Sequence, residues 1–133
     1  MFTHETSLVI PTKNRPHYLK KTLDQINFHK ILFHEIIVVD SSDDEQKKKV
    51  IELTKIYDIK LFNSSPSTSI QRNIGIKKAN ISNKFIMFLD DDIIFTEKMF
   101  INMNKTITKN LQDENIVGFG FNQILEKNKY NFF

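Results

Sequence analysis

The chain has 133 residues and a formal net charge of +3, and it contains no cysteine. This length leaves room for one domain, over residues 1–133, and the missing cysteines exclude disulfide frameworks, thiolate zinc sites and a cysteine nucleophile. Glycine occurs only at positions 75, 118 and 120, which excludes both a glycine-rich dinucleotide fingerprint and a Walker-type phosphate loop.

The basic residues are nearly all lysine, and only Arg15 and Arg72 are arginine. Proteins that read nucleic-acid bases usually present a concentrated basic face with several arginines, so we expect no nucleic-acid partner. The first residues contain no basic segment, and no apolar run approaches the roughly 18 residues of a membrane span. We therefore expect a cytoplasmic protein, with peripheral attachment to a membrane left open.

Short apolar runs alternate with stretches of helical periodicity, which is typical of an α/β fold with crossover helices. A first strand is predicted at residues 7–11, where Pro11 is expected to end it, and a helix is predicted to start at Pro16. The β-branched run at 35–40 predicts a central strand. A helix from Asp44 and a short strand at 59–62 are expected next.

The second half of the chain continues the alternation. A polar loop at 64–69 precedes a predicted helix that carries Arg72, and the run at 85–89 predicts a strand that stops at three aspartates. Thr96 is a plausible N-cap for the helix that follows. Further strands are predicted at 115–121 and within 124–133.

Four polar clusters follow predicted strands, at residues 11–15, 40–44, 64–72 and 90–92. In an open α/β sheet ligands bind beyond the carboxyl ends of the strands, so one crevice is expected to collect these clusters. Three adjacent carboxylates repel each other, and a Mg²⁺ or Mn²⁺ ion that bridges phosphate oxygens relieves the repulsion. The triplet therefore indicates a metal and a phosphorylated substrate, although a turn that caps the next helix is an equal alternative.

Two further residues of these clusters have two interpretations each. Asp40, at the end of its strand, is suited to accept hydrogen bonds from a base or ribose, and it is equally suited to a turn or an N-cap. Arg72, near the start of its helix, is suited to a diphosphate, and the alternative is an ordinary surface residue.

Taken in order, the clusters resemble the family 2 glycosyltransferases of the GT-A fold. The stretches that carry the resemblance are SLVIPTKNRPHYLKKTLDQI, EIIVVDSSDD, SIQRNIGIKKA and FIMFLDDDI. The resemblance implies a Rossmann-like three-layer sandwich with a mainly parallel central sheet. It also implies an enzyme that uses Mn²⁺ or Mg²⁺ to bind a nucleotide-diphosphate sugar, with a UDP-sugar favoured. The sugar would pass to a hydroxyl of a glycan or lipid-linked acceptor, in surface polysaccharide or glycolipid assembly.

The resemblance assigns roles residue by residue. Asp92 matches the last acid of the family's DXD-like motif and is expected to coordinate the metal. The residues expected to bind the nucleotide sugar are Pro11, Thr12, Asn14, Asp40, Arg72, Asp90 and Asp91.

The chain also departs from the family pattern. Ser41 and Ser42 stand where the family commonly has a second Asp and a Gly, so the base contacts are expected to differ. The family's general base lies well after the acidic triplet, and the only acid after Asn122 is Glu126. We therefore expect a fold truncated after the DXD-like region, without the acceptor-binding half. The alternatives are a catalytically incomplete module that binds a nucleotide or pairs with itself or a partner through an exposed edge, and a phosphoacceptor domain.

Overall fold

The structure is a computed structural model that describes residues 1–121. Contacts divide the chain into one compact unit at Met1–Glu97 and a second that starts at Lys98. The helices and strands in chain order are η1 (Phe2–Glu5, a 3₁₀ helix), β1 (Thr6–Thr12), α1 (Pro16–Phe28), β2 (Glu35–Asp40), α2 (Asp44–Leu53), β3 (Lys60–Asn63), α3 (Thr68–Lys78), β4 (Phe85–Phe88) and α4 (Glu97–Asn110).

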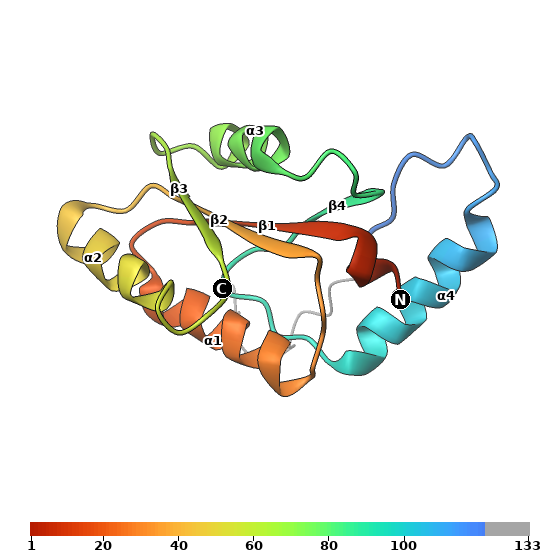
Figure 1. The fold of residues 1–133 in the computed structure, drawn as a ribbon, viewed down its shortest axis with the longest axis horizontal. Coiled ribbons are helices and arrows are strands. Elements are labelled where there is room, and N and C mark those ends of the chain that lie inside the picture. The colour runs from red at the N-terminus through yellow and green to blue at the C-terminus, as the bar shows by residue number, and fades with distance from the viewer. Residues whose placement is uncertain (122–133) are drawn as a thin grey trace, which may run out of the picture. The chain divides into compact units, whose positions relative to one another are not determined.

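The first unit is built on a four-stranded sheet in the order β3-β2-β1-β4. All three strand pairs are parallel, so the carboxyl ends of the strands meet at one edge of the sheet. Helices α1 and α2 cover one face and α3 covers the other (Figure 1). The predicted α/β class, with a parallel central sheet between two helical layers, is confirmed.

Strands β1 and β2 form the centre of the sheet, as the β-branched run at 35–40 predicts for β2. Leu8, Val9 and Ile10 of β1 have no exposed surface, and the same holds for Ile37, Val38 and Val39 of β2. A strand that is covered on both faces needs apolar side chains at consecutive positions, which explains why these runs do not alternate with polar residues.

Pro11 lies inside β1, so the prediction that it ends the strand is wrong. The β1–β4 pairing finishes at Val9 and Phe88, whereas the β1–β2 pairing continues to Thr12 and Asp40. The carbonyl of Val9 accepts a hydrogen bond from the β4 side, from Leu89. The backbone polar groups of every second residue in a strand point to the same neighbouring strand, so the nitrogen of Pro11, like the carbonyl of Val9, faces β4. The β1–β4 pairs have already ended there, and the missing N–H of Pro11 therefore removes no hydrogen bond of the sheet.

Helix α3 approaches the sheet very closely at Gly75. A Cβ atom at this position would lie 2.2 Å from Cγ1 of Val9. The absence of a side chain therefore sets the distance between α3 and β1. On the opposite face, α1 buries Leu19, Leu23 and Ile26, the stripe expected from their spacing.

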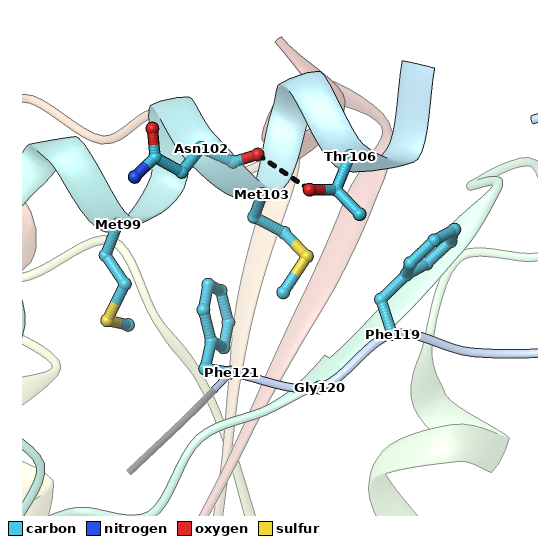
Figure 2. Close-up of a pocket in the computed structure, with 7 residues that line it drawn as sticks. All are labelled: Met99, Asn102, Met103, Thr106, Phe119, Gly120 and Phe121. Atoms are coloured by element: carbon cyan, nitrogen blue, oxygen red, sulfur yellow. Dashed lines mark hydrogen bonds between the residues drawn. The ribbon is translucent and has the colours of Figure 1, made fainter. Parts of the chain in front are cut away.

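The second unit contains nearly all of α4 and residues 111–121. Phe100, Met103 and Ile107 are the buried residues of α4 and share one face by their helical spacing. Leu111, which the same spacing places on that face, follows the end of the helix and is 56% exposed, so its expected place in the stripe is wrong. The ring of Phe100 packs edge-on against Phe121, with centroids 5.7 Å apart. Figure 2 shows a pocket in this unit that is lined by Met99, Asn102, Met103, Thr106, Phe119, Gly120 and Phe121.

The strand predicted at 115–121 is not formed. These residues have irregular backbone, and all of 111–120 is exposed. An apolar sequence becomes a strand only where a neighbour pairs with its backbone, and within the described residues this segment has none. The strand predicted within 124–133 lies outside the described residues. No helix of residues 1–121 combines the length and the apolar character that a bilayer crossing requires.

Candidate functional site

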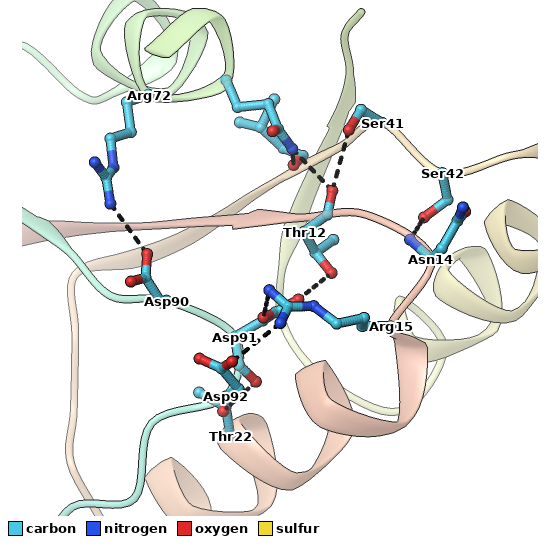
Figure 3. Close-up of polar contacts among 12 residues, drawn as sticks. Thr12, Asn14, Arg15, Thr22, Ser41, Ser42, Arg72, Asp90, Asp91 and Asp92 are labelled. Carbon is cyan, nitrogen blue, oxygen red and sulfur yellow. Dashed lines mark hydrogen bonds and ion pairs between the residues drawn. The ribbon is translucent and has the colours of Figure 1, made fainter. Parts of the chain in front are cut away.

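The polar residues that follow β1, β2 and β4 meet at the carboxyl edge of the sheet (Figure 3). Thr12 ends β1, Asp40 ends β2, and the aspartates 90–92 begin two residues after β4. Direct contacts join these segments, although they are far apart in sequence: the Thr12 hydroxyl, for example, bonds to Asp91, which is 79 residues away. The expected gathering of these clusters at one edge is therefore observed for these three strands.

Asp91 is the buried member of the acidic triplet, with no exposed surface. The Thr12 hydroxyl donates a hydrogen bond of 2.6 Å to Oδ2 of Asp91, and Arg15 forms an ion pair of 2.6 Å with Oδ1. The Thr22 hydroxyl donates to the Asp91 carbonyl over 2.8 Å. Burial raises the pKa of Asp91, whereas the Thr12 hydrogen bond and the Arg15 charge oppose this rise. These contacts attach the triplet to β1 and α1.

Asp90 and Asp92 flank the buried carboxylate and face solvent, with 47% and 42% of their side-chain surfaces exposed. Each is paired with an arginine. Nη1 of Arg15 lies 3.0 Å from Oδ2 of Asp92, and Nη2 of Arg72 lies 3.0 Å from Oδ1 of Asp90. The Arg72 guanidinium also lies over the ring of Phe88, 5.7 Å from its centroid. The two arginines of the chain thus both contact the acidic triplet.

Asp40 is 1% exposed and makes an Asx turn, in which its Oδ1 accepts hydrogen bonds from the backbone N–H and the hydroxyl of Ser42. Oδ1 of Asp40 thus forms the expected turn, while the N-cap of α2 is Asp43. The other oxygen, Oδ2, is buried without a hydrogen-bond partner among the described residues. A buried carboxylate oxygen without a partner is costly, and a ligand donor would remove that cost.

Asn14 joins the loop after β1 to the loop after β2. Its backbone φ is 56°, a left-handed conformation that asparagine tolerates better than most residues. The Asn14 amide donates 2.8 Å to the Asp43 carboxylate, and the Asp43 N–H donates 2.8 Å to Oδ1 of Asn14. The backbone N–H of Asn14 donates a hydrogen bond of 2.7 Å to the hydroxyl of Ser42. Asn14 therefore determines the shape of the rim beside Asp40.

Two residues of the site were not predicted from the sequence. Gln71, on the inner face of α3, is 4% exposed, and its amide donates to the carbonyls of Thr12 and Val39 over 2.8 and 2.7 Å. Arg15 belongs to a recognised cluster, but no role was assigned to it. Gln71 lies one helical turn before Gly75, where α3 lies against β1, and a polar residue at that spacing is the signal that points to it.

No group of three or more acidic or histidine side chains encloses a metal site within residues 1–121. Mg²⁺ and Mn²⁺ sites that act on phosphates commonly use one or two carboxylates and take their remaining ligands from substrate and water. The ion pairs of the triplet use Oδ2 of Asp92 and Oδ1 of Asp90, and the second oxygen of each carboxylate takes no part in them. The exposed carboxylates therefore fit a partial site of this kind.

Sequence comparison shows similarity to one family and to a curated relative. The family model described as Glycosyl transferase family 2 matches residues 7–129. The chain is 30% identical over 100 residues to the minor teichoic acid biosynthesis protein GgaA of Bacillus subtilis (strain 168). The aligned region covers 68% of this chain and 22% of GgaA. The chain thus spans about a fifth of the length of this relative.

Solved structures share the fold. S. aureus TarS 1–349 superposes with a TM-score of 0.64 at 22% identity, over 89% of this chain and 38% of TarS. Its complex with UDP-GlcNAc gives a TM-score of 0.59 at 22% identity, over 80% and 32% of the two chains. The 4-diphosphocytidyl-2C-methyl-D-erythritolsynthase of Anaerococcus prevotii DSM 20548 gives 0.64 at 18% identity, over 82% and 54%. At these identities the similarity establishes the fold alone.

Proposed function

Because the chain belongs to glycosyltransferase family 2, we propose that it binds a nucleotide-diphosphate sugar at the carboxyl edge of its sheet and provides the donor side of sugar transfer to an acceptor hydroxyl. One observation carries this proposal. The buried oxygen of Asp40 that lacks a partner lies at the same sheet edge as the solvent-facing carboxylates of Asp90 and Asp92. A nucleotide-diphosphate sugar needs both features, a polar acceptor for the nucleoside and a charged site for the diphosphate.

The nucleoside is assigned to the β1 and β2 ends of the site. Oδ2 of Asp40 is suited to accept a hydrogen bond from a base N–H or a ribose hydroxyl. Asn14 holds the neighbouring rim in place, while Pro11 and Thr12 form the buried floor from which that rim starts. We favour UDP as the nucleotide, since TarS structures have been determined with UDP-GlcNAc and with UDP.

The diphosphate is assigned to the triplet and Arg72. Asp92 would hold Mn²⁺ or Mg²⁺ and Asp90 would contact the ribose or the sugar, while Asp91 positions the triplet through its contacts with Thr12 and Arg15. Such a cation would stabilise the negative charge that develops on the leaving phosphate. Arg72 supplies a fork of donors to phosphate oxygens once its ion pair with Asp90 opens.

The acceptor is proposed to be a glycan or lipid-linked polymer, in line with the teichoic acid biosynthesis named for GgaA. We assign the general base for the acceptor hydroxyl to none of residues 1–121. Glu126, the last acid of the sequence, lies outside the described residues.

A thermal-shift panel with UDP, GDP, CMP and dTDP, each with and without Mn²⁺, tests the donor site. We expect one nucleotide to raise the melting temperature of the chain only when Mn²⁺ is present, because a ligand that binds the native state alone stabilises it. Asp92→Asn should remove the metal-dependent part of the shift. Asp58→Asn, which changes an exposed acid two residues before β3 begins, at the opposite edge of the sheet, should leave it intact. The absence of a shift with every nucleotide would contradict the proposal.

An interaction module is the second candidate, and β4, the last strand of the sheet that residues 1–121 form, favours it. Ile86 and Phe88 of this strand are 42% and 41% exposed, and contiguous exposed apolar surface often marks an interface. Analytical ultracentrifugation checks this candidate, since self-association through this edge should weaken in Ile86→Lys. A monomer over the whole concentration range would remove the homo-oligomer from consideration.

A further inference from the structure

We propose that Arg15 is an internal counter-ion that competes with a divalent cation for Asp92, so that the cation binds well only together with the diphosphate. This inference rests on the donor-binding function proposed above and concerns how that site is regulated. It gives Arg15 a positioning role, since the residue acts through the carboxylates that it holds.

One guanidinium bridges two neighbouring carboxylates. Nη2 of Arg15 lies 2.6 Å from Oδ1 of Asp91, and Nη1 lies 3.0 Å from Oδ2 of Asp92 (Figure 3). The backbone of Arg15 is held at the start of α1, where its carbonyl accepts hydrogen bonds from the N–H groups of Tyr18 and Leu19. The main chain is thus fixed, and the long side chain is the part that can change partner.

The two ion pairs differ in environment. Asp91 is fully buried, and a buried carboxylate that loses its partner strongly destabilises the folded protein. Asp92 and Arg15 are 42% and 44% exposed in their side chains, and ion pairs in such surroundings are weak. The guanidinium can therefore give up Asp92 while it keeps Asp91, which is the property required of a releasable counter-ion.

The charges of the triplet are already largely balanced by the protein itself. Arg15 and Arg72 together oppose the three carboxylates of the triplet, and a cation at Asp92 would lie beside a guanidinium that pairs with the same group. Like charges so close repel each other, which weakens cation binding in the absence of another anion. A diphosphate adds negative charge that attracts both the arginines and the cation. Cation and nucleotide are therefore expected to strengthen each other's binding by the same factor.

Mn²⁺ binding followed by electron paramagnetic resonance tests the inference without an activity assay. Removal of Arg15 alone would leave a buried charge at Asp91, so the comparison uses Asp91→Asn with and without Arg15→Gln. Without nucleotide, we expect the double variant to bind Mn²⁺ about tenfold more tightly than Asp91→Asn, because a competing ion pair and a repulsive charge both disappear. The enhancement of Mn²⁺ binding by UDP should shrink in the double variant.

Lys13→Gln on the Asp91→Asn background is the matched control, since it removes the same charge from an exposed residue of the same loop. Its Mn²⁺ affinity should change by less than about twofold, because exposed charges without a direct contact are screened. If Arg15→Gln changes Mn²⁺ binding no more than Lys13→Gln does, while UDP still enhances it, the inference is overturned and the donor-binding function stands. If UDP promotes Mn²⁺ binding in none of the proteins, the donor-binding function fails and the inference falls with it.

Discussion

Substitution of Gly75 by alanine tests how closely α3 packs on the sheet. The new Cβ would lie 2.2 Å from Cγ1 and 2.9 Å from Cγ2 of Val9, both far below van der Waals contact. Val9 has no exposed surface and belongs to a central strand, so it has little freedom to move away. Helix α3 must therefore shift outwards, and Gln71 and Arg72 move with it.

The expected loss combines two opposing effects. Overpacking of a buried contact costs about 1–3 kcal/mol, whereas alanine in place of glycine inside a helix gains about 1 kcal/mol. Because the contacts are so short, we place the overpacking cost at the upper end of its range, about 3 kcal/mol. After the gain from alanine, we expect Gly75→Ala to lower the free energy of unfolding by about 2 kcal/mol. Urea denaturation followed by circular dichroism measures this change. The shift of Arg72 and Gln71 should also weaken nucleotide binding.

Val9→Ala provides the second half of a double-mutant cycle, because it removes the two methyl groups that the new Cβ would meet. The double variant should be more stable than the sum of the two single losses predicts, with a coupling of about 1–3 kcal/mol. An unchanged or increased stability of Gly75→Ala, as an open helical position would show, would refute the close packing of α3. Additive losses would do the same.

Three further predictions concern individual buried polar groups. Gln71→Met removes the donor of two strand-end carbonyls and should lower the free energy of unfolding by about 2 kcal/mol, measured by urea denaturation; Gln46→Met, on a half-buried residue of α2, is the control. Asp40→Asn should leave the free energy of unfolding unchanged or higher, since it removes the charge from a buried side chain whose Oδ2 has no partner. The same variant should bind UDP about tenfold more weakly in calorimetry, and an unchanged affinity would remove Asp40 from the nucleoside site. Burial raises the pKa of Glu35, but hydrogen bonds from Lys60, the Ser7 hydroxyl and the Asn80 N–H outweigh it, so the pKa lies below its ordinary value of 4.5. Glu35 therefore stabilises the fold above that value and loses this contribution as the pH falls through its lowered pKa, and Glu35→Gln should flatten the acid limb of a stability-against-pH curve.

The pattern of the sequence predicts most elements of the first unit because their causes are local. The β-branched run of β2, the proline at the first turn of α1 and the stripe of Leu19, Leu23 and Ile26 each determine an element without reference to distant residues. The strand expected at 115–121 fails for the opposite reason. Its apolar residues resemble those of a strand, but pairing requires a neighbour that the segment itself cannot provide.

The placement of Pro11 shows the same dependence on neighbours. Whether proline ends a strand depends on which side its missing N–H faces and on how far the strand on that side extends. Here the β4 pairing stops at Val9, and β1 continues through Pro11 to Thr12 beside β2. Register between strands is a property of the assembled sheet, so the local sequence could not reveal it.

The candidate site divides in a similar way. Sequence alone determined that acids and amides follow the strands. It also predicted that they meet, because a parallel sheet places the carboxyl ends of its strands at one edge. Only the tertiary structure decided which carboxylate of the triplet is buried, that Arg15 bridges Asp91 and Asp92, and that Gln71 joins β1 to β2. Arg15 and Asp92 are 77 residues apart, and such contacts form only when the whole sheet brings its loops together.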